Sequence, residues 1–342
     1  MSYFDGILMG FKISLQIENI FFCLVGVFLG NLVGVLPGIG PLATISLLLP
    51  ITFSFSPVAA VIMLAGIYYG SMYGGTITSV LVNIPGEPAT IVTCLDGYQM
   101  AREGRAGPAL GIAAFGSFIA GTLSLFGLMF LVTPLSNVAI KFQAPEYSGL
   151  IFMGFSLLIY MAQGSKLKAW ISVLIGLILS CGGVDTLSGK TRFDYGIMVL
   201  KDGVGIIPLA IGLFGVSEIL VNLEESHSYT VIKAGIRNLF PSIKDWADSK
   251  WPIMRGTLIG FLLGIIPGGG AIVSSFVSYV VEKKLSRYPE RFGTGVIEGV
   301  AGPESANNSA CSGAFIPLFA LGIPPNVVIA LLMGALLIHG VT

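Results

Sequence analysis

The sequence predicts an all-α protein, a polytopic bundle of transmembrane helices with two internal repeats that contain Pro/Gly-broken helices, either re-entrant or discontinuous. Of its 342 residues, 54% are hydrophobic and only 11% are charged. The mean hydropathy of +0.88 is far above what a water-exposed surface tolerates. Several uncharged runs also reach the length of about 20 residues that a helix needs to cross a bilayer.

The apolar runs follow one another along most of the chain, and the charged residues lie mainly between them. Because each run is close to the length of a spanning helix, the pattern indicates a multi-pass membrane protein. The runs cover residues 17–36, 57–82, 108–132, 146–163, 169–184, 203–221, 252–281 and 310–342.

Two Pro/Gly clusters recur in the same order along the chain. Residues 34–41 (GVLPGIGP) are similar to residues 264–271 (GIIPGGGA), which lie 230 residues later. Residues 83–88 (NIPGEP) correspond to residues 322–326 (GIPPN), which lie 239 residues later. Two matched elements in the same order indicate an internal duplication. Interrupted hydrophobic segments at corresponding positions are typical of the binding sites of membrane transporters.

The duplication divides the chain into four predicted parts. Residues 1–110 form the first repeat with its broken-helix motif, and residues 251–342 form the second repeat with its own. Connecting transmembrane spans occupy residues 111–221, and residues 222–250 form a polar linker that is rich in charged residues.

The positive-inside rule assigns the basic side of a membrane protein to the cytoplasm. If the segment after Pro41 is too short to cross the bilayer, Lys12 and Arg102 lie on the same side of the membrane. We then expect that side, and with it the N-terminus, to be cytoplasmic.

The Pro/Gly clusters are candidate sites for an anion. A helix that restarts after a break presents free N–H groups and a partial positive charge, which attract a carboxylate, and glycine lets a ligand approach the backbone closely. The alternative is that these residues form kinks or close helix contacts, for which small residues are favoured in membranes. The predicted substrate-binding residues are Pro37, Gly38, Gly40, Asn83, Pro85, Gly86, Gly268, Gly269, Gly270, Asn307 and Asn308.

Acidic and hydroxyl residues near the same clusters are candidate ligands for a cation. A carboxylate at membrane depth is costly and suggests a functional site, and hard cations prefer oxygen ligands. The alternatives are a loop at the membrane surface for Glu87 and helix capping for Asn307 and Asn308. The predicted cation-binding residues are Thr44, Ser46, Glu87, Ser274, Glu304 and Ser305.

The sequence does not indicate an enzyme, a cofactor or a metal other than Na⁺. Its two histidines, His227 and His339, have no neighbouring carboxylate pattern for hydrolysis, and no phosphate-binding lysine loop is present. The formal net charge of zero gives no indication of a nucleic-acid partner. A passive channel or a structural subunit of a membrane complex remains an alternative to coupled transport.

At these motifs the chain resembles the large membrane subunit of the tripartite tricarboxylate transporters, the TctA-like family. The resemblance extends over essentially the whole chain, and motifs of this length and order are specific. It is carried by residues 34–40, 69–75, 77–79, 83–88, 266–270 and 302–308.

The resemblance implies a permease subunit of a binding-protein-dependent secondary transporter in the bacterial inner membrane. Such a permease would take up di- or tricarboxylates such as citrate by alternating access and cation symport, with Na⁺ as the expected ion and H⁺ as the alternative. It would work with a small TctB-like membrane subunit and a TctC-like periplasmic solute-binding protein.

The chain departs from the family pattern at two places. Pro324, Pro325 and Asn326 replace the more usual Ile-Pro-Gly pattern, which puts an equivalent coordination by the second half in doubt. The chain also ends at Thr342, within or just after an apolar run, whereas family members continue through further spans. The resemblance therefore implies that the chain is truncated at its C-terminus.

Overall fold

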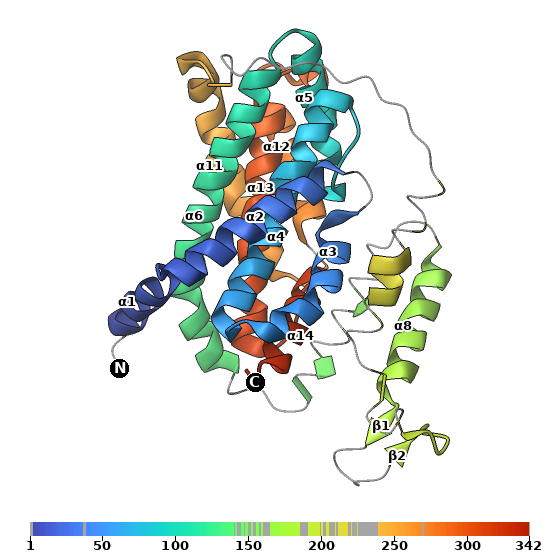
Figure 1. Cartoon of the computed structure of the whole chain (residues 1–342). Helices are drawn as coiled ribbons and strands as arrows, with labels where there is room; N and C mark the ends of the chain where they lie inside the picture. The colour runs from blue at the N-terminus through green and yellow to red at the C-terminus, as the bar shows by residue number, and fades with distance from the viewer. Residues whose placement is uncertain are drawn as a thin grey trace.

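The described part of the chain is almost entirely helical. The computed structural model in Figure 1 describes residues 3–36, 39–139, 165–184, 191–198, 239–268 and 270–341, with shorter stretches between 141 and 224. The main helices are α1 (Tyr3–Ser14), α2 (Ile17–Val35), α3 (Gly40–Leu48), α4 (Pro57–Val82), α5 (Ile91–Arg102), α6 (Ala106–Ala139), α8 (Lys166–Ser180), α11 (Ile243–Ile265), α12 (Gly270–Leu285), α13 (Glu298–Leu321) and α14 (Val327–Ile338).

Short elements complete the described fold. A two-residue antiparallel pair joins β1 (Gly183–Val184) to β2 (Thr191–Arg192) beside α8. The single-turn helices are η1 (Leu49–Ser54), η2 (Pro88–Thr90), η4 (Ile211–Val216) and η6 (Pro289–Arg291). This content confirms the predicted all-α class.

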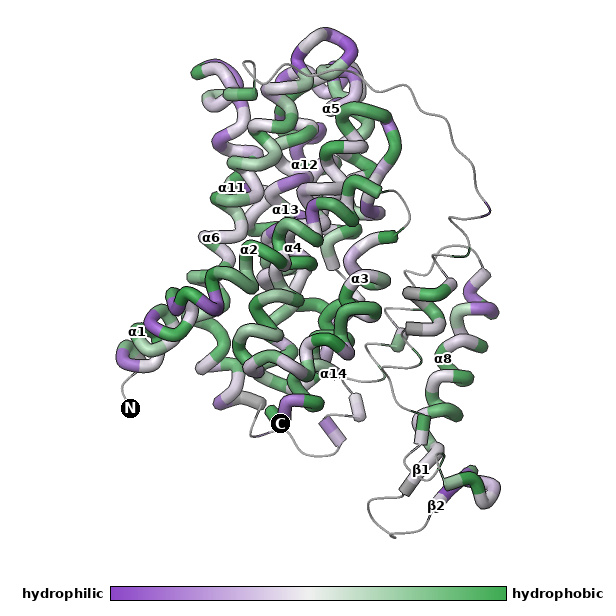
Figure 2. The backbone as a smooth tube through the Cα atoms, in the orientation of Figure 1, coloured by the Kyte–Doolittle hydropathy of each residue, from purple (hydrophilic) through white to green (hydrophobic). Residues whose placement is uncertain are grey.

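The surface of the bundle is apolar in the way that a bilayer requires. Among the described residues, α2, α4 and residues 106–137 of α6 are long and apolar enough to cross a membrane. Large apolar side chains such as Phe28, Phe118 and Leu258 point outward from α2, α6 and α11. Figure 2 shows apolar backbone along α2, α3 and α14, and hydrophilic residues at the end of the bundle that carries α5. A surface of this kind is stable against lipid and unstable in water.

Helices α2 and α4 pack in parallel at very close range. Three glycines of α2, spaced one turn apart, lie directly on backbone carbonyl groups of α4, and a Cβ at any of them would overlap a carbonyl oxygen. Small residues permit this approach, which favours helix association in membranes. The contacts are Gly26 with Met63, Gly30 with Ile67, and Gly34 with Ser71.

Helices α11 and α13 pack in the same way. Again three residues of the first helix, all glycines, lie on carbonyl groups of the second helix, and the pairs advance together along both helices. This pair is therefore also parallel. The contacts are Gly256 with Gly302, Gly260 with Ala306, and Gly264 with Ala310.

The two helix pairs run in opposite directions through the bundle. Tyr69 of α4 hydrogen-bonds to Ser312 of α13, whereas Thr76, two turns further along α4, bonds to Glu304. Because the residue number rises on α4 as it falls on α13, these two central helices are antiparallel. In Figure 1, α4 and α13 cross the centre of the bundle together.

Both predicted Pro/Gly segments separate two helices that fold back on each other. α2 ends at Val35 and α3 begins at Gly40, and α3 then packs against both α2 and α4. α11 ends at Ile265 and α12 begins at Gly270, and α12 packs against both α11 and α13. We call residues 36–40 the first tip and residues 266–270 the second tip.

The direction of α3 contradicts the expectation that Lys12 and Arg102 lie on the same side, which was the basis for the expected orientation of the N-terminus. Since α2 and α4 are parallel, α3 and η1 must return the chain to the end of the bundle where α2 began. α4 then crosses once, so Lys12 and Arg102 lie at opposite ends of the bundle rather than on one side. Figure 1 shows the N-terminus and α5 at opposite ends.

The helix boundaries also refine the division of the chain. α11 begins at Ile243, inside the segment 222–250 that was expected to be a polar linker, and α6 runs through the boundary at residue 110. Ser242 explains the early start of α11, since its hydroxyl accepts from Asp245 N–H at 3.1 Å as an N-cap. Most of residues 199–238 lie outside the described residues.

The glycine contacts predict a specific pattern of stability changes. Gly30→Ala and Gly260→Ala should each lower the unfolding temperature in detergent, since forcing a Cβ into a packed contact costs about 1–3 kcal/mol. Gly121→Ala in α6 is the matched control, because nothing lies within 4 Å of a Cβ added there. If all three variants unfolded at the wild-type temperature, the close packing would contribute nothing.

Candidate functional site

The start of α3 meets the loop that follows α4. Gly40 has a φ of +57°, and a Cβ added there would lie 3.0 Å from Glu87 Oε1. The Glu87 residue is only 6% exposed, and in the described structure its Oε1 is buried without a hydrogen-bond partner. A buried carboxylate oxygen without a donor is unfavourable. This oxygen is therefore available to a ligand that carries positive charge.

Gly86 holds this loop against the first helix pair. Its N–H donates to the carbonyl oxygen of Gly75 on α4 at 3.4 Å. A Cβ at Gly86 would overlap the Gly34 carbonyl oxygen at the end of α2. Only glycine fits between the two helices, so the first tip and the residues after α4 form one packed unit.

The second tip meets the loop that follows α13. Gly268 has a φ of +80°, and its N–H donates to the carbonyl oxygen of Pro325 at 3.0 Å. Asn326 then caps α14, because its Oδ1 accepts from Ile329 N–H at 2.9 Å. Gly270, at the start of α12, has open space where a side chain would be. The second tip is thus joined to the loop between α13 and α14.

Contacts also join the part of the chain around α2–α5 to the part around α11–α14. α12 contacts η2, which follows the loop of the first half, and α3 contacts α14, which follows the loop of the second half. Tyr69 and Ser312 join the central helices through their hydroxyl groups at 2.7 Å, and Asn326 Nδ2 donates to the Tyr68 hydroxyl at 3.5 Å. Polar groups from α4, α13 and the residues before α14 therefore gather where the tips enter the bundle.

Glu304 forms a separate buried cluster in the middle of α13. It is fully buried. Its Oε2 accepts from the Thr76 hydroxyl at 2.6 Å and from Asn307 Nδ2 at 3.1 Å. Its Oε1 accepts from the Thr93 hydroxyl of α5. Three neutral donors from three helices therefore surround this carboxyl group.

Asn308 extends the Glu304 cluster to α6. Its Nδ2 lies 2.8 Å from the Ser117 hydroxyl and 2.6 Å from Asn307 Oδ1. The Ser117 hydroxyl in turn donates to the backbone carbonyl oxygen of Glu304 at 3.2 Å. Both predicted asparagines are thus engaged within this cluster by their side-chain amides.

Asp96 of α5 is a third buried carboxylate, and it binds the chain between α12 and α13. Its Oδ1 accepts from the N–H groups of Gly293, Gly295 and Val296, each at 2.9 Å. Its Oδ2 accepts from the Tyr279 hydroxyl at 2.8 Å. The φ values of +92° and +108° at the two glycines turn these N–H groups toward one point. Asp96 therefore joins the first half of the chain to the second.

The other predicted residues have simpler surroundings. The hydroxyls of Thr44, Ser46 and Ser274 donate to carbonyl groups one turn earlier in their own helices, which leaves their oxygen lone pairs available. Ser305 is buried, and in the described structure its hydroxyl has no partner.

Among the remaining predicted substrate-binding residues, Asn83 ends α4 in a left-handed conformation with an exposed side chain, and Pro85 is half-buried. Three predicted substrate-binding residues, Pro37, Gly38 and Gly269, lie outside the described residues.

Sequence reasoning missed several residues that the structure brings into these clusters. Tyr69 lies in the run 69–75 that carries part of the family resemblance, and Thr76 directly follows that run, but no local pattern indicates a role for either residue. Asp96 is the one acidic residue between Glu87 and Arg102, and an acidic group between apolar neighbours was the available signal. Thr93 and Ser312 give no such signal.

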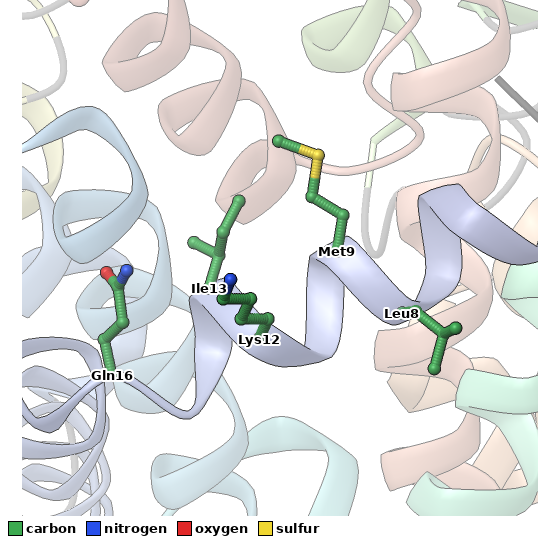
Figure 3. A pocket seen from close by; sticks show the side chains of 5 residues that line it. All are labelled: Leu8, Met9, Lys12, Ile13 and Gln16. Carbon is green, nitrogen blue, oxygen red and sulfur yellow. The ribbon is translucent and has the colours of Figure 1, made fainter.

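A surface hollow on α1 is unrelated to these clusters. It has a volume of about 480 Å³ and is lined by Leu8, Met9, Lys12, Ile13 and Gln16 (Figure 3). None of these residues was predicted to bind a ligand, and α1 projects from the side of the bundle (Figure 1).

The Asp96 contacts predict that Asp96→Asn releases the chain between α12 and α13. An amide in place of the carboxylate removes the negative charge and replaces one of the two acceptor oxygens with an NH2 group, at a cost of roughly 1–3 kcal/mol for each charge-assisted hydrogen bond lost. Trypsin should then cut at Arg287 or Arg291 about tenfold faster, which corresponds to roughly 1.4 kcal/mol. Glu290→Gln, at an exposed position in the same segment, is the control. Equal cutting of both variants would contradict the role of Asp96.

Comparison with known proteins identifies the family. The sequence profile of the tripartite tricarboxylate transporter TctA family matches residues 20–342. An uncharacterized 52.8 kDa protein in the TAR-I ttuC' 3' region of Agrobacterium vitis is 51% identical over 342 residues, which are 100% of this chain and 68% of that protein.

A second relative matches a shorter part of the chain. An uncharacterized protein in the TAR-II ttuC' 3' region of Agrobacterium vitis is 59% identical over 83 residues, or 24% of this chain and 34% of that protein. No solved structure matches the chain significantly. With a family match over residues 20–342, this chain belongs to the tripartite tricarboxylate transporter TctA family and is a component of a transporter, not an enzyme.

Proposed function

We propose that this chain is the membrane permease that carries a di- or tricarboxylate such as citrate across the bacterial inner membrane by Na⁺ symport. Its partners are a TctB-like membrane subunit and a TctC-like periplasmic solute-binding protein. One observation carries the proposal: each tip contacts the loop that follows the second helix of its own pair, and the α2–α4 and α11–α13 pairs run in opposite directions. Interrupted helices of inverted repeats form the binding sites of many secondary transporters.

The glycine contacts support an inverted internal repeat. The three contacting glycines of α11 follow those of α2 by 230 residues, which is the separation of the two Pro/Gly clusters at the tips. Their partners on α13 follow those on α4 by 239 residues, which is the separation of the two later clusters. Alternating access then follows from movement of one half against the other.

Backbone groups at the tips are the proposed ligands of the substrate carboxylates. No lysine or arginine occurs in residues 13–101, 256–282 or 292–342, which contain both tips and their partner loops. The N-termini of α3 and α12 supply partial positive charge instead. Gly40 and Gly270 leave these termini without a covering side chain, and Asn83 can add an amide donor.

Glu87 is the proposed ligand of the coupling sodium ion. Its Oε1 is a buried carboxylate oxygen that has no donor among the described residues, and it faces the start of α3. A bound cation would neutralise the carboxylate and supply the missing interaction. The Thr44 hydroxyl, one turn into α3, has free lone pairs for the same ion.

The distribution of basic residues supports an orientation in the membrane. The end of the bundle with α5, the start of α11 and the end of α12 carries eight basic residues among those that the structure describes, and by the positive-inside rule we assign this end to the cytoplasm. The N-terminus is then periplasmic. The basic residues at this end are Arg102, Arg105, Lys244, Lys250, Lys283, Lys284, Arg287 and Arg291.

Labelled citrate uptake into proteoliposomes that hold the chain with its partner subunits tests the proposal. Uptake should saturate with citrate and collapse when the Na⁺ gradient is dissipated. Glu87→Gln should raise the Na⁺ concentration for half-maximal uptake about tenfold, since losing a charged ligand worth roughly 1.4 kcal/mol has that effect. Exposed Glu103→Gln is the control.

Two other outcomes would contradict parts of this account. Uptake that does not saturate and persists without a gradient would identify a passive channel. Normal Na⁺ dependence in Glu87→Gln would remove this carboxylate from the cation site while leaving symport intact.

A further inference from the structure

We infer that Glu304 binds a proton during transport, so that uptake responds to the pH gradient as well as to Na⁺. The inference rests on the proposed function, because it assigns a role to a second buried carboxyl group of the same permease. It departs from the expectation that Glu304 is a ligand of a metal cation.

No charged side chain of the described residues compensates an ionised Glu304. Glu304 is fully buried near the middle of α13, and it forms no ion pair among the described residues. An isolated ionised carboxylate is very unfavourable in such surroundings, so the group must be neutral or bind a cation.

The titratable neighbours of α13 do not supply that charge. Tyr73 of α4 and Cys94 of α5 interact electrostatically with Glu304, and neither can become a cation. Arg255 of α11 is engaged by Glu282 of α12 through two hydrogen bonds.

The other packed elements are also accounted for. Tyr279 of α12 bonds to Asp96 of α5, and Glu87 at the start of η2 faces Gly40. α6 and α14 carry no titratable residues. The charge of Glu304 is therefore neutralised by something other than these side chains.

The hydrogen-bond partners of Glu304 leave no space for a metal ion beside its carboxyl group. The Thr76 hydroxyl lies 2.6 Å from Glu304 Oε2, and the Thr93 hydroxyl directly contacts Oε1. Metal ions keep each oxygen ligand about 2.0–2.6 Å from the ion, so oxygens in direct hydrogen-bond contact have no ion between them. Glu87 differs, since no donor within the described part of the chain contacts its Oε1. A proton adds no heavy atom and fits Glu304 as it stands.

The Thr76 hydroxyl can hydrogen-bond to Glu304 in both protonation states of its carboxyl group. Its hydroxyl oxygen lies 2.6 Å from Glu304 Oε2 and 3.1 Å from the carbonyl oxygen of Met72. When Glu304 is ionised, the hydroxyl donates to Oε2. When a proton from solution adds to Oε2, the new O–H donates to Thr76, whose hydroxyl rotates to donate to Met72. The carboxyl group can thus gain and release a proton without stranding a donor.

The same turn of α4 connects Glu304 to the first tip. Gly75 precedes Thr76, and a Cβ added at Gly75 would lie 2.8 Å from the backbone nitrogen of Glu87. The Thr90 hydroxyl, beside Glu87, bonds to the Gly75 carbonyl group at 3.3 Å. A change in the hydrogen bonds of Glu304 therefore acts on the helix turn that packs against the proposed Na⁺ ligand.

The test compares wild type with Glu304→Gln, which has the shape of the protonated acid but cannot exchange the proton. Proteoliposomes hold the complete transporter with equal Na⁺ on both sides. In wild type, an acidic outside by about one pH unit should raise citrate accumulation about tenfold for one coupled proton, and a pH dye inside should report acidification on citrate addition. Glu304→Gln should keep citrate exchange and lose both effects. Glu103→Gln should keep all three.

A second pair of variants covers the case that Glu304→Gln does not fold. Thr76→Val removes the hydroxyl that receives the proton and should reduce the response to the pH gradient, whereas Thr76→Ser should preserve it. Each variant is checked for assembly by size-exclusion chromatography.

The outcomes separate this inference from the proposed function. Saturable uptake in wild type that follows Na⁺ alone, with no acidification on citrate addition, would overturn the proton site and keep Na⁺ symport. A full pH response in Glu304→Gln would overturn it as well. Absence of saturable uptake with either gradient would overturn the proposed function itself.

Discussion

A bilayer offers no water to a free backbone N–H or C=O group, and this constraint governs the two places where the helices are interrupted. Hydrogen bonds within each helix pair and its loops satisfy some of the backbone groups near these places. Gly268 donates to Pro325, and Gly86 donates to Gly75. The loops are therefore closed on themselves by hydrogen bonds while the starts of α3 and α12 keep their polar ends.

Close backbone packing holds those loops in register. Glycines along α2 and α11 let these helices lie directly on the carbonyl groups of α4 and α13, so each tip is delivered to a fixed height in the bundle. Association through small residues also suits lipid, where apolar side chains gain little by leaving one hydrocarbon environment for another. The same contacts that stabilise the fold thus position the candidate site.

Three buried carboxyl groups differ in the hydrogen-bond partners that surround them. Asp96 is surrounded by backbone N–H groups and joins two parts of the chain. Glu87 Oε1 lies beside the first tip and has no hydrogen-bond donor among the described residues. Glu304 is surrounded by neutral hydroxyl and amide donors. The difference in their partners, rather than in their chemistry, separates a structural role from two proposed ion-binding roles.

The sequence by itself determined the membrane class, the positions of both Pro/Gly interruptions and the family, because hydropathy and helix-breaking residues act locally. Only the tertiary structure decided which residues meet. Glu304 meets Thr76 and Thr93 through contacts that span more than 200 residues, and no local pattern encodes them. The glycine contacts were equally hidden, since glycine contributes no side chain to an apolar periodicity. The direction of α3, on which the orientation depends, also required the packing of α2 on α4 to be known.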